Sequence, residues 1–66
     1  MRNKLIEIRK KRKLTQEEMA KMLEISRTTY TGYENGTFNP SLEKALEIKK
    51  ILKYKNDDIF LNSNVG

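Results

Sequence analysis

The sequence contains no cysteine and no histidine, and each absence removes a class of function. Without cysteine the chain cannot form a disulfide, a thiolate nucleophile or a thiolate metal site. Without histidine it lacks the commonest metal ligand and the commonest acid–base group near neutral pH. It also lacks a glycine-rich phosphate loop and a paired base and nucleophile. We therefore expect no enzyme activity, no metal and no cofactor.

Long apolar runs are missing as well. No stretch approaches the roughly 18 residues that a membrane span needs, and the N-terminus lacks the apolar segment of a signal peptide. These absences predict a cytoplasmic protein with no membrane partner, and no pattern points to a small-molecule ligand. The 66 residues support one domain with a thin core. With no disulfide or metal to stabilise it, pairing with a second copy is the remaining way to bury more surface.

Positive charge is abundant and unevenly spread. The net charge is +5, with one run at Arg9–Lys13, Arg2 just before it, and a second group at Lys49, Lys50, Lys53 and Lys55. Such clustering favours a polyanionic partner. Lysine and arginine at the end of a helix also interact favourably with its dipole. Charge alone therefore leaves nucleic-acid binding and a solvated helix end as alternatives.

Apolar spacing predicts an all-helical chain. We expect helices over residues 3–13, 16–23, 27–34 and 42–53, a short fifth helix after Asn56, a domain over residues 1–61 and a short polar tail at 62–66. The expected apolar face of the fourth helix is Leu42, Ala45, Leu46, Ile48 and Leu52.

Short polar residues mark the expected helix ends. Asn3, Thr15, Ser26, Ser41 and Asn56 are the predicted N-caps. Thr15 stands three residues before Glu18, which is the spacing of a capping box. Asn35-Gly36 ends the third helix, because both residues tolerate a positive φ.

The second and third helices are separated by only about three residues. So short a turn makes the two helices cross steeply and leaves one face of the third helix projecting. Tyr30 and Tyr33 lie on the inner stripe of that helix, so we place them in the core rather than against bases. In a basic chain, this arrangement predicts a helix that enters a DNA groove.

Six short motifs follow one another along the chain. They are LIEIR at Leu5–Arg9, LTQEEMA at Leu14–Ala20, ISR at Ile25–Arg27, YENG at Tyr33–Gly36, NPSLEKALEI at Asn39–Ile48 and DDIF at Asp57–Phe60. In this order and spacing the chain resembles the phage-repressor type of helix-turn-helix domain, also called the xenobiotic-response-element family. The resemblance extends to small stand-alone regulators of the cytolysin-repressor type.

The resemblance implies a compact five-helix, lambda-repressor-like domain with the helix-turn-helix at its second and third helices. It implies a transcriptional repressor that binds double-stranded DNA at a twofold-symmetric operator as a homodimer. The alternative is an antitoxin-like or bridging protein-interaction module that uses the same fold.

The resemblance also implies roles for particular residues. We expect base contacts from Arg27, Thr28 and Thr31, and phosphate contacts from Gln16, Asn35 and Thr37. The basic run and the start of the third helix add Lys11 and Ser26 as expected phosphate contacts. An arginine can donate two hydrogen bonds to guanine, and a threonine methyl can press against the thymine methyl. The alternatives are a surface salt bridge of Arg27 with Glu24 or another acid, and solvent-facing positions for the threonines and Gln16.

Three residues depart from the family pattern. Glu24 replaces the usual turn glycine, so either it adopts a positive φ or the turn is built differently. Tyr30 stands where Ile or Val is usual. Gly32 occupies a position that often carries a base-reading side chain, and we expect it to let the helix approach the groove closely.

Glu34 is a poor DNA contact by charge, and we expect it to pair with Arg9.

More apolar residues gather near the C-terminal end than a small core needs. The candidate dimer residues are Ile51, Tyr54, Ile59 and Leu61, with Ile6 as a further exposed candidate on the first helix. The alternative is that Tyr54 and Ile59 complete the core of the single chain.

Overall fold

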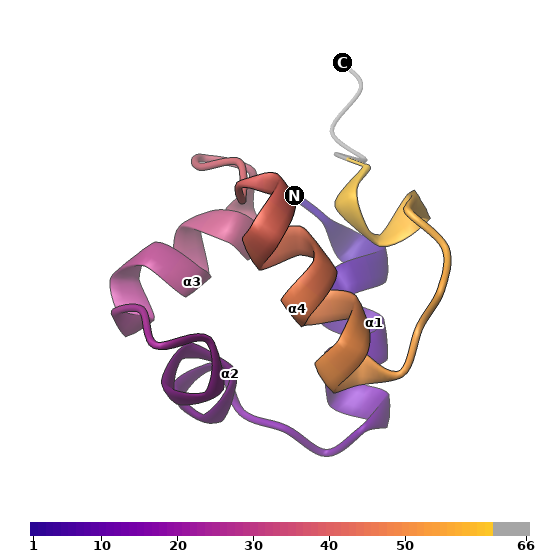
Figure 1. Cartoon of the computed structure of the whole chain (residues 1–66), viewed down its shortest axis with the longest axis horizontal. Coiled ribbons are helices and arrows are strands. Elements are labelled where there is room, and N and C mark those ends of the chain that lie inside the picture. Colours follow the sequence, from indigo (N-terminus) through magenta and orange to yellow (C-terminus); the bar gives the residue numbers. More distant parts are fainter. Residues whose placement is uncertain (62–66) are drawn as a thin grey trace.

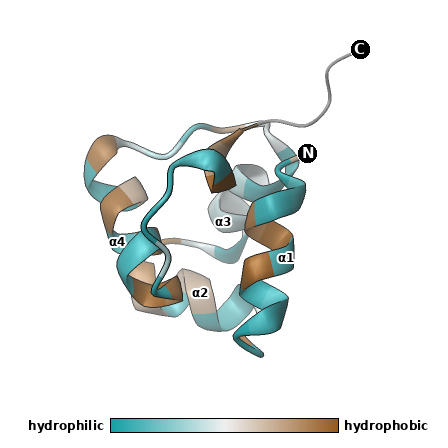
Figure 2. Cartoon of the chain, turned by 90° about the vertical axis from the view of Figure 1, so that its right-hand side faces the viewer, coloured by the Kyte–Doolittle hydropathy of each residue, from teal (hydrophilic) through white to brown (hydrophobic). Residues whose placement is uncertain are grey.

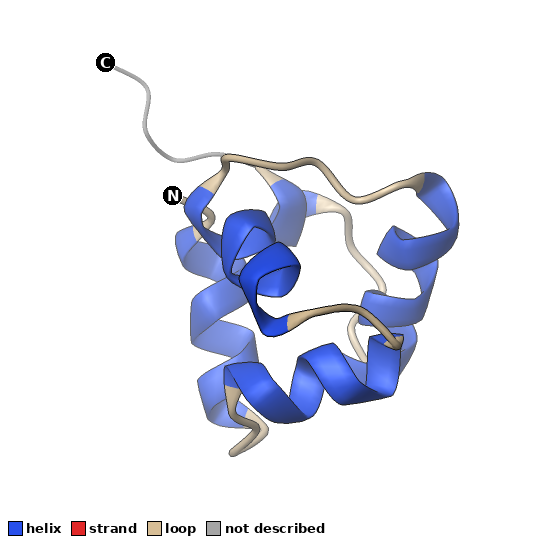
Figure 3. Ribbon diagram, turned by 90° about the vertical axis from the view of Figure 1, so that its left-hand side faces the viewer, coloured by secondary structure: helices blue, strands red, loops and turns tan. Residues whose placement is uncertain are grey.

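The computed structural model describes residues 1–61, and within them the chain is built entirely from helices and loops (Figures 1 and 3). The elements are α1 (Asn3–Lys11), α2 (Gln16–Leu23), α3 (Arg27–Asn35), α4 (Leu42–Leu52) and the 3-10 turn η1 (Asp58–Phe60). The all-helical prediction is confirmed for this part of the chain. The expected tail at 62–66 lies outside the described residues.

The expected fifth α-helix is wrong, because its place is taken by a single 3-10 turn. The Phe60 N–H donates to Asp57 O at 3.0 Å and the Leu61 N–H donates to Asp58 O at 3.2 Å, and both bonds span three residues. The turn begins after Asp57 with no side-chain cap, so the cap predicted at Asn56 is not made.

Three predicted N-caps are confirmed by hydrogen bonds. Thr15 Oγ1 accepts from the Glu18 N–H at 3.0 Å, and the Thr15 N–H donates back to Glu18 Oε1 at 2.8 Å, which completes the capping box. Ser26 and Ser41 each accept from the backbone N–H three residues on. The cap predicted at Asn3 is wrong, since the N-cap of α1 is Arg2, whose side chain makes no hydrogen bond to the first turn of the helix.

Helix ends are set by residues with positive φ. Gly36 ends α3 at φ 87°, as predicted. Glu24 ends α2 at φ 58°, so the first of the two alternatives for that residue holds. The Ile25 N–H then donates to Ala20 O at 3.0 Å, a closing bond of the Schellman type. Lys13, at φ 60°, lies just beyond α1, which ends two residues earlier than predicted.

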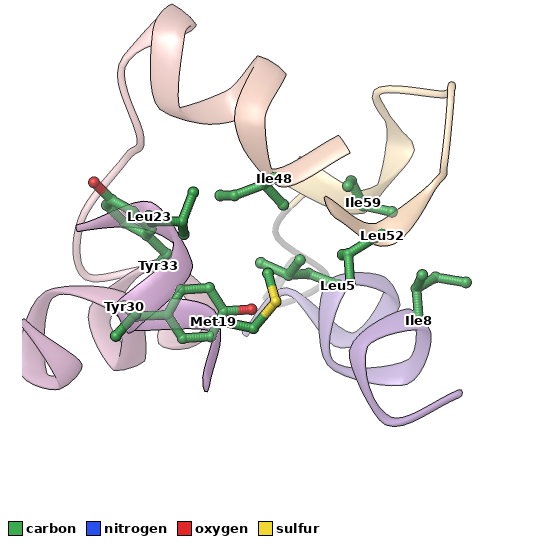
Figure 4. Close-up of a cluster of buried hydrophobic side chains, with 10 residues drawn as sticks. Leu5, Ile8, Met19, Leu23, Tyr30, Tyr33, Ile48, Leu52 and Ile59 are labelled. Carbon is green, nitrogen blue, oxygen red and sulfur yellow. The ribbon is translucent and has the colours of Figure 1, made fainter. Parts of the chain in front are cut away.

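Side chains from every helix and from η1 meet in one core (Figure 4). The buried apolar residues are Leu5, Ile8, Met19, Ala20, Leu23, Tyr30, Tyr33, Ile48, Leu52 and Ile59. The Tyr30 and Tyr33 rings pack edge to face with their centroids 6.2 Å apart, which confirms the prediction that both belong to the core.

The predicted apolar face of α4 is partly wrong. Ile48 and Leu52 are fully buried, but Leu42 is 78% exposed and Leu46 is 53% exposed. Each residue turns a helix by about 100°, so Leu42 and Leu46 lie to one side of the stripe that reaches the core. Figure 2 shows brown hydrophobic and teal hydrophilic residues interspersed along the ribbons of α1 and α4.

Candidate nucleic-acid interface

The outer side of α3 projects from the fold as the sequence predicts. Tyr30 and Tyr33 anchor its inner side in the core, while Arg27 and Thr28 are exposed and Thr31 is half-buried. In Figure 1, α2 and α3 lie together at one side of the molecule. Within the described residues Arg27 forms no ion pair with Glu24, so its guanidinium is available to a ligand.

An open hollow of about 500 Å³ lies beside this projecting side. Its lining residues are Gln16, Arg27, Thr28, Thr31, Gly32, Asn35, Thr37 and Phe38. We call this surface the α3 hollow. Three elements form it: the start of α2, the outer side of α3 and the loop that follows α3. It therefore brings together six of the eight residues predicted to contact DNA.

The other two predicted contacts lie outside the α3 hollow. Ser26 caps α3, and its hydroxyl donates to Thr29 Oγ1 at 2.9 Å besides accepting from the Thr29 N–H. Lys11 is exposed at the end of α1. A duplex that contacted either residue would have to extend past the rim of the α3 hollow.

Gln16 is held in place by two hydrogen bonds. Its Nε2 donates to Glu34 Oε1 at 2.9 Å, and its Oε1 accepts from Thr31 Oγ1 at 3.3 Å. An amide nitrogen has two protons to donate, so one remains for a ligand in the α3 hollow. The residue also lies in the first turn of α2, where unpaired backbone N–H groups attract anions.

Behind Gln16 lies a buried ion pair. Arg9 Nε donates to Glu34 Oε2 at 2.6 Å, and the two side chains are only 9% and 2% exposed. Arg9 Nη1 also donates to Leu14 O at 2.7 Å. The predicted pairing of Glu34 with Arg9 is confirmed. The sequence did not reveal that the same carboxylate also positions Gln16, and so links the core to the α3 hollow.

The Tyr30 hydroxyl lies in the same buried region near Glu34 and Arg9. It makes no hydrogen bond to any described residue. Burial raises the pKa of this phenol well above its usual value, the Glu34 carboxylate raises it further, and Arg9 opposes the shift. At position 30 the core therefore holds a ring whose hydroxyl has no hydrogen-bond partner among the described residues.

Arg2 is a structural residue, and grouping it with the basic run was wrong. Its side chain is buried and donates to three carbonyl oxygens: Tyr33 O at 2.6 Å, Phe38 O at 3.0 Å and Phe60 O at 2.9 Å. Its Nη2 also donates to Asn39 Oδ1. Arg2 thus ties the N-terminus to the end of α3, to the loop after α3 and to η1.

Gly32 has a role that the sequence did not predict. A Cβ atom at this position would lie 2.2 Å from Cδ2 of the Phe38 ring, which is well inside contact distance. The ring packs over the helix at position 32. The absence of a Cβ at Gly32 therefore admits an aromatic ring from the following loop.

The predicted dimer residues differ in exposure. Leu61 is 67% exposed, while Ile51 and Tyr54 are half-buried against the core. Ile59 is fully buried, so its proposed place in a dimer interface is wrong. Ile59 lies among the core side chains of the single chain, which was the alternative prediction for this residue. Ile6 is half-buried.

The part of the chain that the structure describes holds neither a membrane-spanning helix nor a metal-binding cluster. No helix there is long and apolar enough to cross a membrane. No group of three or more acidic, histidine or cysteine side chains there is placed to hold a metal ion.

Sequence comparisons with known proteins point to one family. The helix-turn-helix family matches residues 5–58. An uncharacterized HTH-type transcriptional regulator of Methanocaldococcus jannaschii is 44% identical over 61 residues, covering 92% of each chain. A second uncharacterized HTH-type transcriptional regulator, from Archaeoglobus fulgidus, is 41% identical, and the alignment covers 92% of this chain and 86% of the relative. The regulator YgzD of Bacillus subtilis is 35% identical, covering 91% of each chain.

No solved structure gives a significant match. The family match covers most of the chain, and the relatives align over nearly their whole length. The chain belongs to the Cro-type, phage-repressor family of helix-turn-helix proteins.

Proposed function

We propose that this protein is a sequence-specific transcriptional repressor that inserts α3 into the major groove of double-stranded DNA. The observation that carries the proposal is the α3 hollow, where six residues with the expected contact chemistry meet on one surface. A net charge of +5 also favours a polyanionic partner such as DNA. The relatives named as HTH-type transcriptional regulators support this function as well.

Each residue of the proposed site has a distinct role. Arg27 reads a guanine through two hydrogen bonds, and Thr28 and Thr31 contact neighbouring base edges. Gln16 donates to a phosphate with the amide proton that Glu34 leaves free. Asn35 and Thr37 bind the backbone from the end of α3 and the loop after it. Ser26 and Lys11 contact more distant phosphates at the rim.

The protein acts as a homodimer in this proposal, because one short helix reads too few base pairs for a useful target. Two copies on a twofold axis would present their α3 helices about 34 Å apart, one turn of DNA. Leu61, Ile51 and Tyr54 form the proposed contact between copies. A competing contact is the exposed pair Leu42 and Leu46 on α4.

Analytical ultracentrifugation of Leu61→Lys and Leu46→Lys gives the mass of each variant in solution. The two masses decide which of the two surfaces forms the dimer. The proposal expects the wild type to be a dimer, Leu61→Lys to be a monomer and Leu46→Lys to remain a dimer. The reverse pattern would move the interface to α4.

An antitoxin-like or bridging module is the second candidate, and the exposed apolar pair on α4 favours it. Leu42 and Leu46 lie one turn apart and outside the α3 hollow, so they suit a partner protein rather than DNA. Such a module would bind DNA through charge alone or not at all.

Selection of bound sequences from a pool of random duplexes decides between the two functions. A repressor enriches a twofold-symmetric sequence, binds it far more tightly than random duplex, and loses affinity steeply as salt rises. Equal affinity for the selected and the random duplex would reject the proposed function and favour the interaction module.

A further inference from the structure

We propose that Phe38 reads DNA by packing its ring against the C5-methyl group of a thymine, in place of a side chain at position 32. This inference rests on the proposed function of the α3 hollow. It adds a specificity-determining residue that lies outside the helix-turn-helix itself, in the loop between α3 and α4. In Figure 1 that loop stands at the rim of the molecule.

The position of the ring is the first argument. Phe38 lines the α3 hollow together with Arg27, Thr28 and Thr31, yet it is 47% exposed. Its ring packs over Gly32 so closely that a Cβ there would lie 2.2 Å from Cδ2. The ring therefore occupies the surface from which a side chain at position 32 would project.

The rigidity of the loop is the second argument. The Phe38 N–H donates to Gly32 O at 3.1 Å, and Phe38 O accepts from Arg2 Nη1 at 3.0 Å. Arg2 is itself buried and also bonds to Asn39 and to Tyr33 O. Both sides of the Phe38 peptide backbone are thus fixed, so the ring is held at the α3 hollow before any ligand binds.

The chemistry of the ring selects the ligand. A phenyl ring has no hydrogen-bond donor or acceptor for a phosphate or for the polar edge of a base. In the major groove the apolar group that distinguishes one base from the others is the thymine methyl. An apolar ring left half-exposed beside Arg27 and two threonines therefore fits a thymine next to the bases that those residues contact.

Replacing the methyl group tests the contact directly. The sequence selected by the wild type is synthesised with deoxyuridine in place of each thymine in turn, and the affinity of each duplex is measured for the wild type and for Phe38→Ala. The wild type should lose about fourfold in affinity at one thymine per half-site, as expected for one buried apolar carbon. Phe38→Ala should bind the thymine and deoxyuridine duplexes equally at that position.

Two further variants control for folding and for general apolar effects. Gly32→Ala forces the ring from its place while leaving it in the chain, and it should abolish the same thymine preference. Met22→Ala removes an apolar side chain of similar exposure, 46%, outside the α3 hollow, and it should leave the preference intact. Thermal melting of each variant confirms that it is folded.

The possible outcomes are distinguishable. If the wild type selects a sequence but Phe38→Ala keeps the full thymine preference, the inference is overturned while the proposed function stands. If Phe38→Ala weakens every duplex equally, the ring contacts sugar rather than a methyl group, and the inference is again overturned. If the wild type selects no sequence at all, the proposed function fails and this inference fails with it.

Discussion

Arg9 and Glu34, 25 residues apart in the chain, form an ion pair of 2.6 Å that is almost completely shielded from solvent. The pair joins α1 to α3, and Glu34 Oε1 also accepts from Gln16 at the edge of the α3 hollow. Burying an ion pair removes the hydration of both charges, and the attraction between the two groups has to offset that loss. Its consequence for stability can be measured.

Arg9→Met should be severely destabilising, because it leaves the Glu34 carboxylate buried without a cation. The expected loss is about 3–5 kcal/mol in the free energy of unfolding, which is comparable to the whole stability of so small a domain. Urea unfolding followed by circular dichroism measures it. The double variant Arg9→Met/Glu34→Leu should recover most of the loss, since neither charge is then buried alone. A single variant that loses less than about 1 kcal/mol would contradict this account.

Arg2→Ala should destabilise the chain by about 2–3 kcal/mol, because three carbonyl oxygens and the Asn39 amide lose a charged donor. Two of those oxygens belong to Tyr33, near the end of α3, and to Phe60 in η1. Lys10→Ala is the matched control, since Lys10 is an exposed cation on the helix that follows Arg2, and it should change stability by less than about 0.5 kcal/mol. Equal losses in urea unfolding would show that Arg2 acts only through net charge.

The sequence predicts best what neighbouring residues determine. The caps at Thr15, Ser26 and Ser41 follow from a side chain and a backbone N–H three residues apart, and all three are present. The projecting side of α3 follows from the positions of Tyr30 and Tyr33. Arg27, Thr28 and Thr31 share that projecting side of α3, whereas Gln16 lies on α2 and was assigned through the family resemblance.

The sequence predicts poorly what distant segments determine. Arg2 reaches Phe60 across 58 residues, and nothing local distinguishes it from the other basic residues near it. Phe38 covers Gly32 only because the loop returns over α3, so the glycine makes room for the ring of a residue that lies outside the helix. The apolar spacing predicted a broad apolar side for α4 but not which part of that side faces the core. For this reason Leu42 and Leu46, which are exposed, were assigned to the apolar face.

Glu24→Gly should stabilise the protein by about 0.5–1 kcal/mol. A left-handed backbone costs an L-residue roughly 1–2 kcal/mol, and glycine removes that strain at a smaller cost in the entropy of the unfolded chain. Glu24 has φ 58°, so the strain applies to it. Glu24→Ala is the control, because it removes the same carboxylate but keeps the strain. If both variants raise the melting temperature equally, the effect belongs to the charge and not to the backbone.

Tyr30→Phe should leave stability at neutral pH unchanged or raise it by up to about 1 kcal/mol. The hydroxyl is buried without a hydrogen-bond partner among the described residues, so its removal gives up no bond and relieves a desolvated group. Chemical unfolding at pH 7 measures the difference. A loss of 1 kcal/mol or more would mean that the hydroxyl is bonded to Glu34 in solution.

The same variant should alter the dependence of stability on alkaline pH. Burial raises the pKa of Tyr30 in the folded chain above its value in the unfolded chain. Below about pH 10 the phenol is neutral in both states, so its titration does not affect the free energy of unfolding. Above that pH the unfolded chain releases the proton first, and the wild type loses up to about 1.4 kcal/mol per pH unit relative to Tyr30→Phe. Parallel stability curves for the two proteins between pH 9 and pH 11 would contradict the assigned burial.

Arg27→Ala and Lys11→Ala should weaken DNA binding in different ways. Arg27 lines the α3 hollow and is proposed to read a guanine, so its loss should cost about 1–3 kcal/mol on the selected duplex and relax the preference at one position. Lys11 is exposed away from the α3 hollow and is proposed to meet only phosphate. Its loss should weaken all duplexes alike and reduce the salt slope by about one. Binding titrations of both variants against selected and random duplex separate the two effects, and an Arg27→Ala variant that still discriminates fully would remove Arg27 from the reading side of α3.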